Sequence, residues 1–215
     1  LFKQAGIEDG ICIWTYSTSA HSYFATINNF ATPGEYYRVF ADLGADYVMD
    51  QGVADSCLPV LEALKLYTMS KMFYRRDYDY NEMVEDFIEH YYGVAADEMK
   101  EYYGFIRTRY KYLNENESFT GRIFSDTTLP AYWPRATVLE MMDIIDRGLA
   151  KVETIKSSDP ARYEVLHDRL KREKLSPIYL MFTHYMSYLS QSEKEEYWND
   201  MNTYTTKFNI IGTRE

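Results

Sequence analysis

The first 75 residues alternate between short apolar runs and amphipathic segments. Residues 11–14 form an apolar run that predicts a strand. Residues 47–49 predict a second strand, which ends in Asp50, Gln51 and Gly52. Each strand is followed by a helical pattern. This order is typical of parallel sheets whose faces are covered by helices.

The two helices of this part carry different patterns. Thr32-Pro33-Gly34-Glu35 is a capping-box pattern with proline at the first helical position, and Gly44 is expected to end that helix. Residues 58–74 are apolar over most of their faces, so they predict a buried helix. We expect this second helix to join the α/β part to the rest of the chain.

From about residue 79 the pattern is helical only. Asp79 and Glu82 form a capping pair for a helix that Gly93 ends, and residues 95–113 repeat the apolar stripe. Residues 114–132 show no period and predict a long loop. Three more helices are expected: one from Pro134, one from 159–160 with a kink or break at Pro177, and one with a Ser192…Glu195 capping box ending near Gly212.

These elements predict an α/β unit followed by an all-α part, with helix as the main content. We place the first unit at residues 1–76 and the C-terminal helical domain at residues 77–215. A parallel sheet of two strands is rarely stable by itself. The sequence therefore predicts that further strands lie upstream of Leu1 or come from another chain.

Composition narrows the possible partners. The chain has 215 residues and a formal net charge of −10, which argues against nucleic acid and against anionic membranes. No apolar run approaches the ~20 residues of a membrane span, and no signal peptide is visible. Aromatic residues make up 17% of the chain, with 22 tyrosines. Tyrosine suits both helix packing and sugar-binding clefts, because it combines a ring with a hydroxyl group.

Candidate chemistry gathers after the two predicted strands, where open α/β sheets and barrels bind ligands. Aromatic rings stack on sugar rings, and Asp and Gln bind pairs of hydroxyl groups. The sequence therefore predicts a carbohydrate-contacting surface formed by Trp14, Tyr16, His21, Asp50 and Gln51. Alternatively, the aromatic residues cap the core and pack a loop, His21 is solvated, and Asp50 caps its own loop.

Other chemistries lack support in the sequence. His21, His90, His167 and His184 show no metal-ligand spacing, so we expect no metal and no cofactor. There is no glycine-rich phosphate loop and no nucleophile elbow. Cys12 and Cys57 are expected to be buried thiols, with a disulfide as the alternative. No convincing pair of glycosidase carboxylates is present, so the catalytic residues stay unknown.

Three stretches resemble a known family: "IWTYSTSAHSYFATINNF", "GADYVMDQG" and the long run from Leu61 that contains "YYGVAA". Together they make residues 10–113 similar to a bacterial family that is glycoside-hydrolase-like, of unassigned substrate, and placed near the alpha-glucuronidases. The chain departs from the family pattern at Thr15, where members often carry Asp or Asn.

The resemblance implies the last βα units of a TIM-type (β/α)₈ barrel followed by a helical domain. It also implies a secreted or periplasmic bacterial protein, with catalytic carboxylates on earlier strands. Carbohydrate is then the expected substrate, and the chain supplies substrate-binding loops. The alternative is a non-catalytic α-helical interaction or structural module.

Overall fold

The computed structural model describes residues 10–19, 22–25, 32–52, 60–75, 77–117, 119 and 126–210. The predictions for His21 and Cys57 concern residues outside these ranges. The elements, in chain order, are β1 (Cys12–Tyr16), α1 (Thr32–Asp42), β2 (Tyr47–Gln51), α2 (Glu62–Tyr74), α3 (Tyr80–Tyr92), η2 (Gly93–Ala95), α4 (Ala96–Asn116), α5 (Arg135–Glu153), α6 (Pro160–Tyr185), η3 (Met186–Tyr188) and α7 (Gln191–Lys207).

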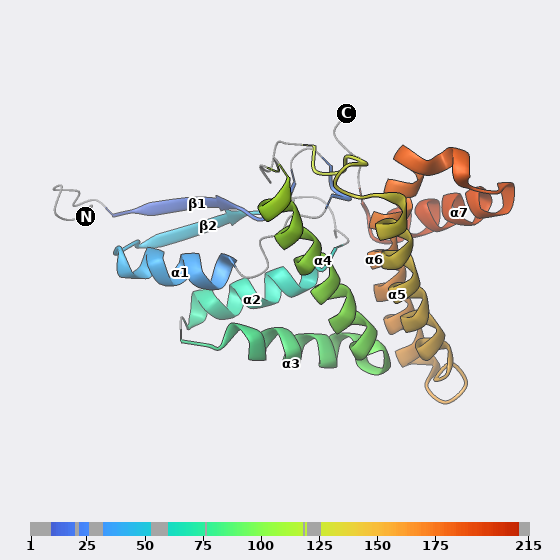
Figure 1. Ribbon diagram of the computed structural model, residues 1–215. Helices are drawn as coiled ribbons and strands as arrows, with labels where there is room; N and C mark the ends of the chain where they lie inside the picture. Colours follow the sequence, from blue (N-terminus) through green and yellow to red (C-terminus); the bar gives the residue numbers. More distant parts are fainter. Residues whose placement is uncertain are drawn as a thin grey trace.

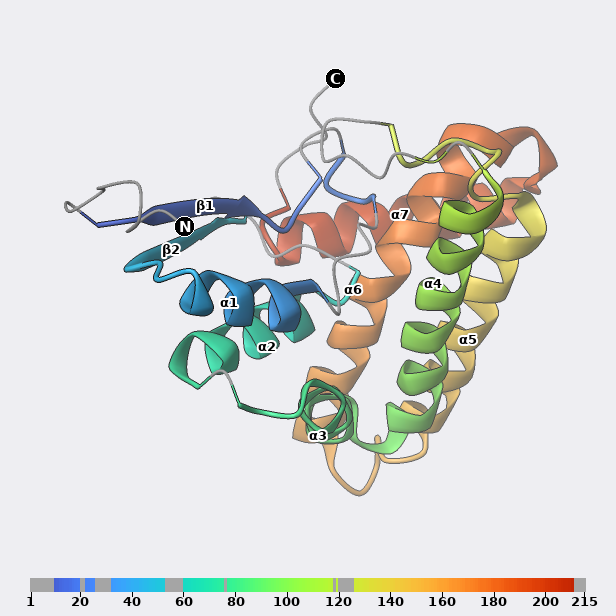
Figure 2. The same cartoon turned by 60° about the vertical axis from the view of Figure 1, so that its left-hand side comes forward.

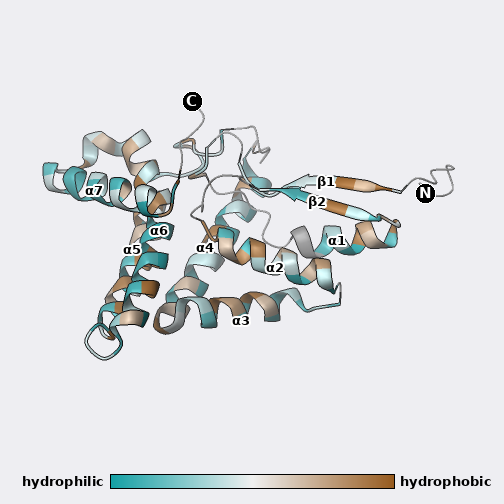
Figure 3. Ribbon diagram, turned by 180° about the vertical axis from the view of Figure 1, so that it is seen from behind, coloured by the Kyte–Doolittle hydropathy of each residue, from teal (hydrophilic) through white to brown (hydrophobic). Residues whose placement is uncertain are grey.

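The two described strands form a parallel pair, as the sequence predicts. Their register runs from Cys12 opposite Tyr47 to Tyr16 opposite Gln51. Helices α1 and α2 lie on one side of this pair, and among the described elements none covers the other side (Figures 1 and 2). Figure 3 shows hydrophobic stretches in both strands. The sheet is therefore covered on one face only within the described part of the chain.

The helical part is built around α6. Helix α5 packs against both α4 and α6, and α7 packs back on α6. The main core cluster includes Leu61 and Leu64 of the α/β part together with Tyr102 and Ile178 of the helices. One continuous core thus crosses the boundary that the sequence places between residues 76 and 77.

Several predicted helix ends are confirmed. Asp79 accepts hydrogen bonds from the backbone N–H groups of Asn81 and Glu82, as an N-cap should. Gly44 has φ +81°, so it takes the left-handed conformation just after α1 ends. The buried stripe predicted for residues 95–113 is confirmed as the core-facing side of α4: Met99, Tyr102, Tyr103, Ile106, Tyr110 and Leu113.

Other predicted boundaries are wrong. The last capping box is Ser190 with Glu193, two residues before the predicted pair, and α7 ends at Lys207 rather than near residue 212. Helix α6 continues through Pro177, so the break expected there is absent. Residues 172–178 are buried on this helix, so tertiary packing offsets the backbone hydrogen bond that proline removes. Helix α4 also runs three residues into the predicted loop.

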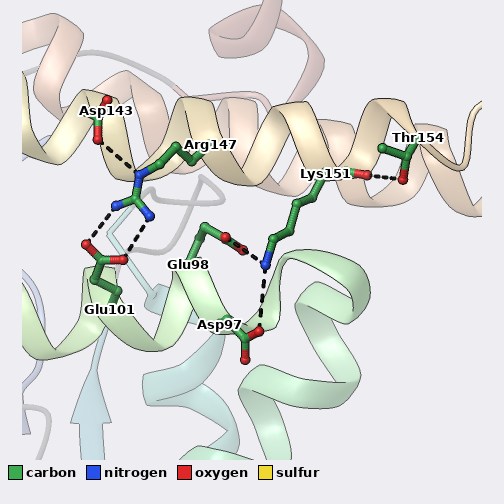
Figure 4. A network of polar contacts seen from close by, with 7 residues as sticks. All are labelled: Asp97, Glu98, Glu101, Asp143, Arg147, Lys151 and Thr154. Carbon is green, nitrogen blue, oxygen red and sulfur yellow. Dashed lines mark hydrogen bonds and ion pairs between the residues drawn. The ribbon is translucent and has the colours of Figure 1, made fainter.

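Ion pairs join α4 to α5 at the surface (Figure 4). Arg147 of α5 donates to both carboxylate oxygens of Glu101, at 2.7 and 3.0 Å, and to Asp143 at 3.0 Å. Lys151 lies 2.8 Å from Oε1 of Glu98. These hydrogen bonds raise the pKa of Arg147 and of Lys151. The pairs link the facing sides of α4 and α5, although an exposed pair such as Arg147 with Glu101 contributes little stability.

The start of α2 depends on a residue 112 positions away. Val60 and Leu61 have φ of 64° and 59°, so α2 begins at Glu62 and not near residue 58 as predicted. The backbone N–H of Leu61 donates to Oε2 of Glu173 on α6 at 2.7 Å. Tyr92 donates its hydroxyl to Oε1 of the same carboxylate at 3.1 Å. A buried carboxylate from the helical part therefore caps the last helix of the α/β part.

Helix α2 contributes to the core shared by the α/β part and the helical part, and we call this its hub role. It leads to a first prediction. Leu64 has no exposed surface and belongs to the main core. Leu64→Ala is expected to lower the free energy of unfolding by roughly 2–5 kcal/mol, because it leaves a cavity where the two parts meet. A reversible urea titration measures this loss. A loss below ~1 kcal/mol contradicts the hub role of the helix.

The cap from Glu173 leads to a second prediction. Glu173→Gln keeps the shape of the side chain but replaces one acceptor oxygen with a donor. We expect it to lower the free energy of unfolding at neutral pH by about 1–3 kcal/mol. Tyr92→Phe is the matched control, because it removes one hydrogen bond to Glu173 and is expected to cost less, about 1 kcal/mol. Equal losses in the two variants contradict a capping role.

The effect of Glu173→Gln on the free energy of unfolding should depend on pH. Burial raises the pKa of Glu173, so the folded protein holds this proton at a pH where the unfolded chain has released it. The contribution of the carboxyl group to stability is therefore greatest below its ordinary pKa and declines as the pH rises through the raised value. Glu173→Gln removes this titration. The stability difference between wild type and variant should shrink across this range, and a constant difference contradicts the raised pKa.

Candidate functional site

Alternate residues of the two strands point away from α1 and α2 and form an exposed face. Both strands show the same alternation, in which the first, third and fifth residues are exposed. This face carries no charged side chain: it consists of Cys12, Trp14, Tyr16, Tyr47, Met49 and Gln51. It is unusual for a parallel sheet, whose strands are normally buried on both faces.

The carboxyl ends of the strands carry the polar and aromatic part of this face. The Trp14 side chain donates through Nε1 to Oε1 of Gln51 at 3.0 Å. The rings of Trp14 and Tyr16 lie 6.4 Å apart between centroids, tilted by 30°. These residues are 56% and 46% exposed. We call Trp14, Tyr16 and Gln51 the aromatic platform, because two rings and one carboxamide lie side by side on it.

Asp50 lies on the other face of β2. Its carboxylate accepts hydrogen bonds from the hydroxyls of Thr15 and Ser17, at 2.8 and 2.5 Å. Tyr37 of α1 lies close to Asp50. Burial, followed in size by the charge of Asp50, raises the pKa of the Tyr37 phenol. The expectation that Asp50 and Gln51 approach one surface is therefore corrected, since neighbouring residues of a strand point to opposite faces.

Charged groups of α2 extend this polar cluster beneath the sheet. Lys65 is buried and donates through Nζ to the backbone oxygen of Ser17 at 3.3 Å. Oε2 of Glu62 lies 3.8 Å from the same nitrogen. Burial lowers the pKa of Lys65, while the charges of Glu62 and Asp50 raise it in part. Burial also raises the pKa of Glu62. The lysine thus lies among carboxylates that favour its charged form.

The segment after β1 is fastened to the helical part. The Ser176 hydroxyl of α6 donates to the backbone oxygen of Phe24 at 2.6 Å. The Phe24 ring stacks on Tyr179 with a centroid distance of 5.2 Å, and a small core cluster joins it to Leu175 and Tyr204. Part of the segment that follows β1 is therefore buried, and the described aromatic residues that remain exposed near the strand ends are those of the platform.

The structure separates the five predicted site residues. Trp14, Tyr16 and Gln51 meet on the exposed face, Asp50 lies beneath the sheet, and His21 lies outside the described residues. Cys12 is exposed and free, which corrects the expectation of a buried thiol.

Neither a metal site nor a membrane span is found in the part that the structure describes. No group of three or more His, Cys, Asp or Glu residues there is arranged to hold a metal ion. Among the described helices none is long and apolar enough to cross a membrane.

Comparison with known families and structures gives one match. Residues 3–104 match a family described as a domain of unknown function (DUF4838). No curated protein and no solved structure matched the chain. The matched residues contain both strands and all five predicted site residues, and they end inside α4. The match therefore covers the part of the chain that carries the aromatic platform, and its description assigns no activity.

The sequence did not reveal the residues beneath the sheet. In the sequence, Ser17 resembles an ordinary loop residue, and Lys65 lies within an apolar helix pattern where a charge is unexpected. Lys65 lies on the buried face of the helix that follows β2, and β2 carries Asp50. Because a buried charge needs a partner, this combination could have indicated that the lysine and the carboxylate lie close together. Glu173 is likewise a charged residue on the buried side of α6, so it also needs a partner.

Proposed function

We propose that this chain is the C-terminal part of a carbohydrate-active protein, a glycoside hydrolase acting on polysaccharide or oligosaccharide. The aromatic platform supports this proposal. Two exposed rings side by side can stack on the apolar faces of sugar rings. The Gln51 carboxamide uses its oxygen to hold Trp14, which leaves its N–H groups facing the same side as donors for hydroxyl oxygens.

The exposed face of the sheet supports the proposal that further strands surround this platform. In a (β/α)₈ barrel the inward side chains form stacked layers, and ligands bind at the carboxyl ends of the strands. In such a barrel, Cys12 and Tyr47 would lie deepest on the exposed face, and Tyr16 and Gln51 would lie nearest the rim. We propose that earlier βα units supply the remaining strands and the catalytic carboxylates.

The first test replaces the larger ring of the platform. Trp14→Ala in the full chain is expected to weaken oligosaccharide binding roughly three- to tenfold, because one stacking ring contributes about 1 kcal/mol. The free energy of unfolding should change by less than about 1 kcal/mol, since the ring is exposed. Calorimetric titration with xylo-, manno- and gluco-oligosaccharides measures affinity, and a urea titration measures stability.

The chain offers a matched control. Trp198 on α7 is 61% exposed and lies in the helical part, so Trp198→Ala makes the same change away from the platform. It should leave oligosaccharide affinity unchanged. If Trp14→Ala lowers stability by the ~3–5 kcal/mol typical of a buried tryptophan while affinity stays the same, Trp14 is a core residue and the proposal fails.

A further inference from the structure

The residues beneath the sheet alternate with those of the platform. Thr15 follows Trp14 on β1, Ser17 directly follows Tyr16 at the end of β1, and Asp50 precedes Gln51 on β2. Because side chains alternate between faces, holding one residue of a strand sets the direction of its neighbours. Asp50 binds the hydroxyls of Thr15 and Ser17 at the same time. One carboxylate therefore ties the carboxyl ends of both strands together from below.

Lys65 connects the strand ends to the helical part. Its Nζ donates to the backbone oxygen of Ser17, the residue that directly follows Tyr16 at the end of β1. Helix α2, which carries Lys65, is itself held at its N-terminus by Glu173. A continuous set of contacts thus runs from α6 through α2 to the end of β1.

We propose that Ser17, Asp50 and Lys65 are positioning residues, which set the orientation of Trp14, Tyr16 and Gln51 from the opposite face of the sheet. This role replaces direct sugar contact as the function of Asp50. Its consequence for ligand affinity rests on the carbohydrate-binding function proposed above, whereas its consequence for the Trp14–Gln51 hydrogen bond does not.

The test observes that hydrogen bond directly. The indole N–H of Trp14 gives one resonance in a ¹H–¹⁵N spectrum of the full chain, and Trp14→Phe identifies it among the signals of the three tryptophans. Ser17→Ala, Asp50→Asn and Lys65→Met are each expected to shift or broaden this resonance. They should also weaken binding, roughly three- to tenfold, of the xylo-, manno- or gluco-oligosaccharide that binds wild type best.

Asp126→Asn is the matched control. Asp126 also accepts two hydrogen bonds, from the backbone N–H and the hydroxyl of Thr128, and in the sequence it lies between α4 and α5. It should leave the Trp14 resonance in place. Ser17→Ala is the mildest of the three changes, so it keeps the test decisive if Lys65→Met fails to fold.

The outcomes separate this inference from the proposed function. An unchanged Trp14 resonance in folded Ser17→Ala and Asp50→Asn overturns the positioning role, whatever the affinities are. A shifted resonance in a protein that binds none of the oligosaccharides supports the positioning role and counts against the carbohydrate function. A shift of equal size in Asp126→Asn also overturns the positioning role, because the effect is then not specific to the strand ends.

Discussion

The hydrogen bond from Leu61 to the Glu173 carboxylate is the contact on which the arrangement of the two parts depends. It joins the N-terminus of α2 to the middle of α6 inside the protein. Left-handed backbone at Val60 and Leu61 costs of the order of 1–3 kcal/mol per residue, and the carboxylate offsets this cost by accepting the N–H that this geometry presents. Tyr92 and Arg172 complete the surroundings of Glu173, so the buried charge has partners on several sides.

The position of α2 then determines the chemistry on the two faces of the sheet. Lys65 reaches Ser17 beneath the sheet because α2 lies on that side of the strands. Polar groups gather there around Asp50, while the opposite face keeps uncharged and aromatic side chains. The strand ends thus separate a polar cluster, in which Asp50 bonds Thr15 and Ser17, from the exposed aromatic platform. This separation places Trp14 and Asp50 on different faces, although both belong to the same two strands.

Sequence reasoning predicted the parts of the fold that depend on local pattern. The α4 stripe and the Asp79 cap are local features, and the parallel strands follow from βα alternation. It failed where distant residues decide. The start of α2 needs Glu173, and the continuity of α6 through Pro177 needs packing on several sides. Asp50 was misplaced for a local reason, because it neighbours Gln51 on one strand and the two side chains therefore point to opposite faces. Of the candidate site, the sequence pointed to Trp14, Tyr16 and Gln51, which the structure brings together, but not to Ser17 and Lys65 beneath the sheet.

Oxidative footprinting of the full chain tests the central claim most directly, because it reports whether the platform is open and whether a sugar covers it. Hydroxyl radicals modify exposed Trp and Tyr side chains, and mass spectrometry locates the products. We predict that Trp14 and Tyr16 react without ligand, and that saturating oligosaccharide protects both while Trp198 continues to react. Trp14 and Tyr16 that are already protected without sugar, or that react equally with and without it, would contradict the account.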